Sequence, residues 1–359
     1  MYLLGGFTLL VLVLWGFERL YLRGQGVESY PPPTDPEAVQ RFIRSGGPGP
    51  EFQQLIKVVR ELTLRISIGR SHQNLQAARS AFDSISAGHE FKSEFFPVDA
   101  GGMPAEWVIA PGADKTRRML YIHGGGFVVG SPISHRAITS KFAEITGCAV
   151  LAIDYRLMPE HHYSDCIEDC RTAYRWILNN GPEGSGEIRQ LFIGGDSAGG
   201  NLALSLISWI RDNGLRPPEA VVALSPLTDV TFSGASLQDN LDTDIMLKPF
   251  MQPLIRLPQF ARSWYVYWTY KVRPRSPVVS PLLGDLSNLP PTLVQASEAE
   301  MLLDDARRYV YKACASGSPA KLQTWPDMVH IWQIFDPQIP QAVEAWVEID
   351  KFLKDRASA

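Results

Sequence analysis

The chain has 359 residues, of which 45% are hydrophobic and 20% charged, enough apolar material for one large core or two medium ones. Its formal net charge of −4 leaves no basic surface, so the composition gives no electrostatic support for binding nucleic acid. The four cysteines lack the paired spacing of a zinc site and are expected to be buried free thiols, so the sequence predicts no metal.

The N-terminus is strongly apolar. Residues 2–17 carry no charge, and together with Leu20 and Leu22 they approach the ~20 residues that span a bilayer. The stretch has neither the basic start nor the small-residue cleavage site of a signal peptide. We therefore expect residues 1–23 to form an uncleaved, single-pass membrane anchor, for example in the endoplasmic reticulum, with residues 2–22 in the membrane. The alternative is an amphipathic or buried helix that belongs to a lid.

Residues 24–91 are interpreted as a linker followed by N-terminal cap helices. Proline and glycine are frequent over 30–37 and 45–50, which is typical of irregular structure. Helical periodicity follows over 51–68, in FQQLIKVVRELTLRI.

Residues 92–359 are predicted to form the main domain. Short β-branched runs alternate there with helical stretches, and the expected strands are EWVIAPG, RMLYIHGG, AVLAIDY, QLFIGGD, AVVALSP, PTLVQAS and AKLQTW. Such alternation predicts an α/β fold with a doubly wound, mostly parallel sheet covered on both faces. The aromatic and proline-rich residues at about 230–278 interrupt the alternation and are expected to form an inserted helical cap.

The pentapeptide GDSAG, residues 195–199, lies between the expected strand LFIG and the helix NLALSLISWI. A serine at this place sits on a sharp strand-to-helix turn with its hydroxyl at the carboxyl end of the sheet, where flanking glycines keep the neighbouring backbone clear. Ser197 is therefore the candidate nucleophile.

A second glycine-rich motif, HGGGF at residues 123–127, follows the expected strand MLYI. Acyl transfer needs N–H donors for a developing oxyanion, and HGGG is an arrangement that supplies them. We expect the oxyanion hole in the run Gly124, Gly125 and Gly126, chiefly in the last two, together with Ala198. His123 is expected to brace the loop. A phosphate cradle is disfavoured because no GK[ST] follows.

These two motifs occur with YRLMPEHHY at 155–163 and VSPLLGDLSNLPPTLV at 279–294. In this order they resemble the hormone-sensitive-lipase-like carboxylesterase branch of the α/β-hydrolase fold family. The resemblance runs from about residue 95 to the C-terminus. It implies a serine esterase whose helical cap is built from N-terminal residues and the inserted segment.

The general base must be one of seven histidines. In α/β-hydrolases the nucleophile precedes the acid and the acid precedes the histidine. His330, in the loop WPDMVHIW after the strand AKLQTW, is the one histidine downstream of Ser197. The family resemblance also places the catalytic histidine in such a loop.

The acid should follow the strand PTLVQAS, where four carboxylates are available: Glu298, Glu300, Asp304 and Asp305. The two aspartates are expected in the first turns of the next helix, where the helix dipole favours them. The resembled family has an acidic-x-acidic pattern at this point, and its second, catalytic position falls on Glu300. The sequence thus favours Glu300, although an aspartate is more usual there.

The predicted activity is hydrolysis of a small-to-medium apolar carboxylic ester or lactone through an acyl-enzyme, without a cofactor. Three alternatives remain open at this stage. They are an arylacetamide-type deacetylase, a hydrolase in the biosynthesis of a specialised metabolite, and a non-catalytic ligand receptor. The oligomeric state is not predicted.

Overall fold

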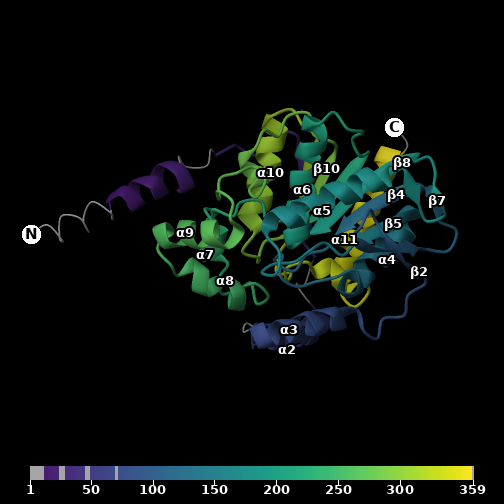
Figure 1. The fold of residues 1–359 in the computed structure, drawn as a ribbon. Helices are drawn as coiled ribbons and strands as arrows, with labels where there is room; N and C mark the ends of the chain where they lie inside the picture. The colour runs from purple at the N-terminus through teal and green to yellow at the C-terminus, as the bar shows by residue number, and fades with distance from the viewer. Residues whose placement is uncertain (1–11, 24–28, 45–48, 69–71, 358–359) are drawn as a thin grey trace, which may run out of the picture.

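The computed structural model describes residues 12–23, 29–44, 49–68 and 72–357. Within them, nine strands form one sheet in the order β1-β11-β10-β9-β8-β4-β5-β3-β2 (Figure 1). β3 pairs antiparallel with β2 and β5, and the other neighbours in the sheet are parallel. The strands are β1 Val39–Arg41, β2 Glu94–Asp99, β3 Pro104–Ile109, β4 Asp114–Ile122, β5 Cys148–Ile153, β8 Gln190–Asp196, β9 Ala220–Leu224, β10 Thr292–Ser297 and β11 Ala320–Trp325.

The predicted mostly parallel α/β fold is confirmed, and each of the seven expected strands is present. β1 and β2 were not predicted. β1 is a three-residue strand in the supposed linker, and it forms because it pairs with β11. β2 contains Pro97, which argues against a strand in the middle of a sheet, but it lies at the sheet edge where proline is tolerated. A separate hairpin joins β6 Asn180–Gly181 to β7 Gly184–Ser185.

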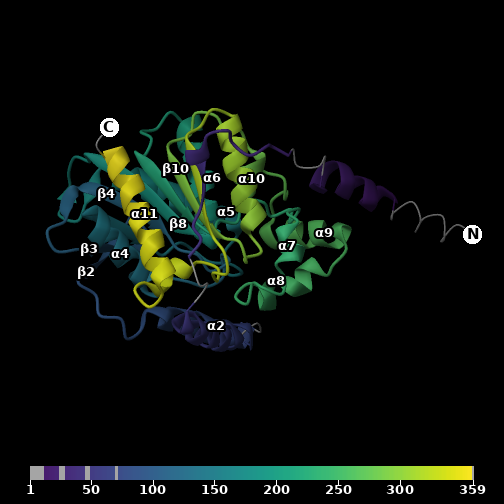
Figure 2. The ribbon, with the colours of Figure 1, turned by 180° about the vertical axis from the view of Figure 1, so that it is seen from behind.

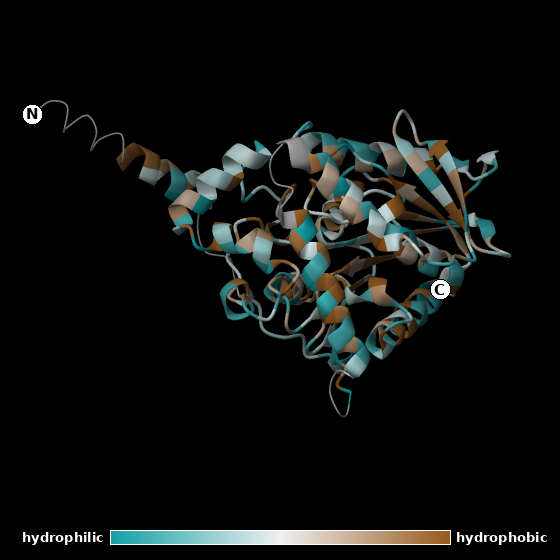
Figure 3. Ribbon diagram, turned by 90° about the horizontal axis from the view of Figure 1, so that it is seen from below, coloured by the Kyte–Doolittle hydropathy of each residue, from teal (hydrophilic) through white to brown (hydrophobic). Residues whose placement is uncertain are grey.

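Helices cover both faces of the sheet (Figures 1 and 2). α5 Tyr163–Ile177, α6 Ser197–Asp212 and α10 Leu303–Ala315 pack on one face around the larger core. α4 Arg136–Thr146 and α11 Pro340–Ala357 pack on the other around a second core. β5, β9 and β10 are buried along their whole length, as expected of strands covered on both sides. In Figure 3 many of the strand segments are accordingly hydrophobic, while the surrounding helices show both polar and apolar residues.

Five further helices lie beyond the carboxyl edge of the sheet. α2 Pro50–Ile68, which includes the helix predicted over 51–68, packs against α3 His72–Asp83. The segment expected to form a cap contains three helices, α7 Ser236–Asp239, α8 Lys248–Ile255 and α9 Gln259–Tyr270. α2 also contacts α8, so the N-terminal helices and the inserted helices meet.

The expectation of a membrane anchor is wrong. Within the described residues, no helix is long and apolar enough to cross a membrane. Residues 12–23 form a short helix whose last six residues, Glu18–Arg23, are π-helical. This helix lies beside α9 (Figures 1 and 2), and its buried Glu18 accepts a hydrogen bond from the Ser263 hydroxyl at 2.8 Å. Residues 2–11 of the expected anchor lie outside the described part of the chain.

Candidate active site

Ser197 begins α6 directly after β8, on a turn that only glycine neighbours permit. Its φ is +52°, a left-handed conformation that is unfavourable for serine and that marks functional turns. A Cβ on Gly199 would lie 2.0 Å from the Ile122 carbonyl oxygen, and one on Gly195 would lie 2.5 Å from the Gly199 carbonyl oxygen. The motif therefore brings strand, turn and helix into close contact and leaves Ser197 partly exposed.

His330 and Glu300 form a buried pair at the same edge of the sheet. Glu300 follows β10, His330 follows β11, and these strands are parallel neighbours, so their carboxyl ends coincide. The Nδ1 atom of His330 lies 2.6 Å from Oε2 of Glu300, while Oε1 of Glu300 accepts the Ser297 N–H at 3.0 Å. Both carboxylate oxygens are thus engaged, and the ring orientation is fixed.

The electrostatics of His330 favour its protonated form. Burial by itself lowers the pKa of this imidazole, but the hydrogen bond and the negative charge of Glu300 outweigh burial and raise the pKa above its ordinary value. Asp244 and Asp196 raise it further. The other ring nitrogen, Nε2, is buried and has no hydrogen-bond partner among the described residues. It is therefore available for an incoming group.

The other three carboxylates that follow β10, which are Glu298, Asp304 and Asp305, have different partners. Glu298 forms a two-pronged ion pair with Arg41, with N···O distances of 2.7 and 2.6 Å, and so connects the acid loop to β1. Asp304 accepts the N–H of Ser236 at 3.0 Å at the start of α7. In the described part of the chain, neither of these two carboxylates forms a hydrogen bond or an ion pair with His330.

Asp305 is buried in the first turn of α10 and accepts the N–H groups of Thr228 and Asp229 at 2.7 and 2.9 Å. Its burial, with the nearby Asp229, raises the pKa of this carboxyl to about 8. The expected interaction with the helix dipole explains why an acid lies in this turn. The two hydrogen bonds show that Asp305 also holds the loop that follows β9.

The HGGG loop follows β4 and is stabilised by the GDSAG motif. The Gly124 N–H donates to Oδ1 of Asp196 at 3.1 Å, so Gly124 anchors the loop. Gly125 has a φ of +109°, and a Cβ there would lie 2.1 Å from the Val129 carbonyl oxygen. Within the described residues, the N–H groups of Gly125 and Gly126 donate to no other group. Together with Ala198 they remain the candidate oxyanion donors.

His123 is a buried, neutral brace. Burial lowers its pKa to about 3, with the neighbouring His135 contributing. Its Nδ1 lies 2.7 Å from the Gly124 carbonyl oxygen, and its ring stacks on Tyr155 with centroids 4.3 Å apart. The Tyr155 hydroxyl in turn donates to the His123 carbonyl at 2.9 Å. These contacts hold the start of the loop at the carbonyl groups of His123 and Gly124.

The sequence did not indicate a second buried histidine–carboxylate contact. Oδ2 of Asp196 lies 3.4 Å from Nε2 of His135, and Oδ1 accepts the Tyr121 hydroxyl at 2.6 Å. Burial alone would raise the pKa of Asp196, but His135 and the Tyr121 hydroxyl lower it below its usual value. The sequence does show an aspartate, Asp196, immediately before the candidate nucleophile. Its partner His135 lies 61 positions earlier, and no local pattern connects the two.

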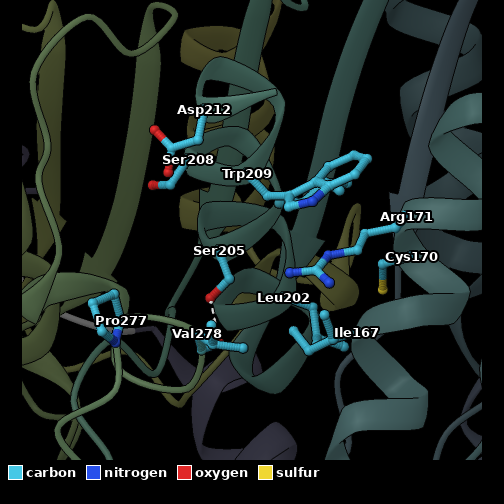
Figure 4. Close-up of a pocket in the computed structure, with 11 residues that line it drawn as sticks. Ile167, Cys170, Arg171, Leu202, Ser205, Ser208, Trp209, Asp212, Pro277 and Val278 are labelled. Carbon is cyan, nitrogen blue, oxygen red and sulfur yellow. Dashed lines mark hydrogen bonds between the residues drawn. The ribbon is translucent and has the colours of Figure 1, made fainter. Parts of the chain in front are cut away.

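The structure also contains a small cavity of about 120 Å³ between α5 and α6 (Figure 4). Arg171, Trp209 and Asp212 line it, and none of the candidate catalytic residues does. Among the described residues, no three His, Cys, Asp or Glu side chains are placed so as to hold a metal ion.

Comparison with known proteins agrees with this geometry. Residues 119–334 match the α/β hydrolase fold family, and the chain belongs to it. An acetyl-hydrolase of Streptomyces hygroscopicus is 36% identical over 72% of this chain and 81% of its own length. An esterase of Acinetobacter venetianus is 33% identical over 71% of this chain and 80% of its own.

A crystal structure of an esterase from the bacterial hormone-sensitive lipase family matches with a TM-score of 0.74 and 34% identity. The match covers 86% of this chain and 99% of that one. The resemblance to the hormone-sensitive-lipase-like branch is thereby confirmed. The protein is a carboxylic-ester hydrolase of the serine type.

Proposed function

We propose that Ser197, His330 and Glu300 form the catalytic triad, with Gly125, Gly126 and Ala198 as the oxyanion hole. The observation that carries this proposal is the 2.6 Å contact between His330 and Glu300, which leaves the buried Nε2 of His330 without a partner. A carboxylate on Nδ1 fixes the tautomer in which Nε2 accepts a proton.

In the proposed mechanism, Nε2 of His330 takes the proton of Ser197 as its oxygen attacks the ester carbonyl. Glu300 stabilises the imidazolium that forms. The protonated His330 then donates to the leaving alcohol, which departs from the acyl-enzyme. Water attacks the acyl-enzyme in the second half while His330 accepts its proton, and His330 then returns this proton to the Ser197 oxygen as the carboxylic acid is released.

The oxyanion donors act on the negative charge of the tetrahedral intermediates. Ala198 lies at the N-terminus of α6, where the helix dipole favours negative charge, and its N–H follows the nucleophile directly. Gly125 and Gly126 supply the other donors from the HGGG loop. Because Gly124 is fixed to Asp196, which directly precedes Ser197, the loop and the nucleophile are held by one side chain.

The proposed substrate is a small-to-medium apolar ester. The chain continues from the oxyanion loop into Val128 and Val129, which pack with Ile66 of α2 and Phe250 of α8. Aliphatic and aromatic side chains around the loop favour an apolar acyl or alcohol group. The similarity to a protein named acetyl-hydrolase supports a short acyl group.

The triad is tested with p-nitrophenyl butyrate and a phosphonate that labels nucleophilic serines. We expect Ser197→Ala to reduce kcat by roughly 10⁶-fold and to abolish labelling in the intact mass spectrum. Ser205→Ala, on the same helix, is the control and should retain both. Turnover like that of the wild type in Ser197→Ala would exclude the proposal. Matched lactones and anilides in the same assay then define the preferred class of substrate.

A further inference from the structure

The acid loop, residues 298–301, has weak hydrogen bonding of its own. The Glu300 N–H lies 3.5 Å from the Ser297 carbonyl oxygen, and the Leu303 N–H lies 3.3 Å from the Glu300 carbonyl oxygen, both at the long end for hydrogen bonds. These two backbone hydrogen bonds hold the loop only loosely, and the shorter local ones run from the Ser297 N–H to Oε1 of Glu300 and from the Ala299 N–H to the Ser297 hydroxyl, both at 3.0 Å.

Shorter hydrogen bonds reach the acid loop from the cap loop, residues 236–244. The Asn240 side-chain amide donates to the carbonyl oxygens of Glu298 and Glu300 at 2.9 and 2.8 Å. The Thr243 hydroxyl donates to the carbonyl oxygen of Ala299 at 2.8 Å. Three consecutive carbonyl groups of the acid loop thus accept hydrogen bonds from two side chains of the cap loop.

The end of the acid loop is held in the same way. The Met301 N–H donates to Oδ2 of the buried Asp244 at 2.8 Å, and the Met301 carbonyl accepts the Ser236 hydroxyl at 2.7 Å. The other oxygen of Asp244 accepts the N–H groups of Met246 and Leu247 at 3.1 and 2.8 Å. One carboxylate therefore joins the acid loop to the residues that enter α8.

Asp244 also brings a charge close to the active site. Three carboxylates act on His330 from different elements: Glu300 after β10, Asp196 at the end of β8, and Asp244 from the cap. Each of them favours the imidazolium, so a change at Asp244 affects both the geometry and the electrostatics of the pair.

We propose that Asn240, Thr243 and Asp244 are positioning residues that hold Glu300 against His330, so that the alignment of the triad depends on the seating of the cap. The inference rests on the proposed triad. It assigns the inserted segment a role in catalysis besides enclosing the substrate. Since Asp244 is bonded to the entrance of α8, and Phe250 of α8 belongs to the apolar cluster next to the oxyanion loop, displacement of α8 would be transmitted to the acid.

The test compares two aspartates of the same loop. Asp242, whose side chain is 88% exposed, pairs with Lys248 at 2.6 Å and, among the described residues, has no hydrogen bond or ion pair to the acid loop. With p-nitrophenyl butyrate we expect Asp244→Asn to lower kcat on the order of 100-fold with little change in KM, because misplacing a catalytic group acts on the chemical step. Asp242→Asn should match the wild type.

A second readout separates positioning from general loss of structure. The pH at which kcat/KM reaches half of its plateau should fall in Asp244→Asn, because the imidazolium of His330 loses one of its three carboxylate neighbours. Partial unfolding would lower the plateau without moving this midpoint. Asn240→Leu removes two hydrogen bonds but no charge, so it should lower kcat and leave the midpoint in place.

Thr243→Val supplies a variant that is expected to fold, because Thr243 is exposed and loses one hydroxyl. We expect it to reduce kcat several-fold at an unchanged unfolding temperature, as removal of a single supporting hydrogen bond would do. If Ser197→Ala is inactive while the Asp244, Asn240 and Thr243 variants all equal Asp242→Asn, the positioning role is excluded and the triad stands. If Ser197→Ala is active, the triad itself fails.

Discussion

Two buried histidine–carboxylate contacts lie at the carboxyl edge of this sheet, and they differ in their length and in which ring nitrogen meets the carboxylate. In the first, Nδ1 of His330 lies 2.6 Å from Glu300, and the remaining nitrogen has no partner among the described residues. In the second, Nε2 of His135 lies 3.4 Å from Asp196. The Nδ1 atom of His135 is occupied by the Ser134 hydroxyl at 2.9 Å.

Similar side chains thus serve different purposes at the same edge of the sheet. His330 lies in a loop at the strand end and meets its carboxylate through Nδ1, whereas His135 precedes α4, bonds Ser134 through Nδ1 and approaches Asp196 with Nε2. Asp196 also fixes Gly124 and accepts the Tyr121 hydroxyl. The first pair is therefore suited to moving protons, and the second to holding the oxyanion loop.

The largest expected effect separates the two histidines. His330→Asn should lower kcat on the order of 10⁶-fold, because no other group replaces the base. His135→Asn should leave kcat within about tenfold of the wild type and reduce the free energy of unfolding by about 1–3 kcal/mol, the cost of disrupting buried hydrogen bonds. Steady-state kinetics and denaturant titration measure both quantities. Equal losses of kcat would remove the distinction between the pairs.

An intermediate effect is expected in the oxyanion loop. Gly125→Ala should lower kcat by about 10²–10³-fold, because its Cβ would lie 2.1 Å from the Val129 carbonyl oxygen and displace the donor. Gly126→Ala has open space around the new Cβ, although its φ of +62° disfavours alanine, so its loss should be smaller. Steady-state kinetics with p-nitrophenyl butyrate measure this ranking. The reverse order would argue against Gly125 as an oxyanion donor.

The smallest expected effect is a shift in the pH profile. Only neutral His330 accepts a proton, and its pKa is raised, so kcat/KM should rise with pH through a midpoint above 6.5, the ordinary histidine value. In Glu300→Gln the midpoint of the residual activity should move to lower pH. Without the carboxylate of Glu300, burial lowers the pKa of His330 with less opposition. His123, with a pKa of about 3, should not contribute in this range. A midpoint that stays unchanged in Glu300→Gln would argue against the pair.

Much of the fold was predictable because it depends on local patterns. Hydrophobic strands alternating with helices gave the parallel sheet, and the two glycine motifs gave the turns at its edge. β1 was not predictable, because three residues carry no periodicity and pair only through the tertiary fold. The membrane anchor was wrongly predicted for a similar reason: hydropathy does not show that Glu18 is buried against Ser263 of α9.

In the candidate site, Ser197 and His330 could be named from motif and order. Glu300 could be identified only through the family resemblance. Four carboxylates lie within eight residues, and a local sequence pattern does not distinguish among them. The structure distinguishes them by their partners. The cap loop was beyond prediction, since Asn240 lies about 60 positions before the carbonyl groups that it holds.

The most direct test of the account compares Glu300→Gln with Asp304→Asn and Asp305→Asn in kcat for p-nitrophenyl butyrate. Each change replaces a carboxyl group with an amide of nearly the same size. We expect Glu300→Gln to lose roughly 10⁴-fold, as when a catalytic histidine is left in the wrong tautomer, and the other two to lose far less. A loss in Asp304→Asn or Asp305→Asn that exceeds the loss in Glu300→Gln would contradict the assignment of the acid.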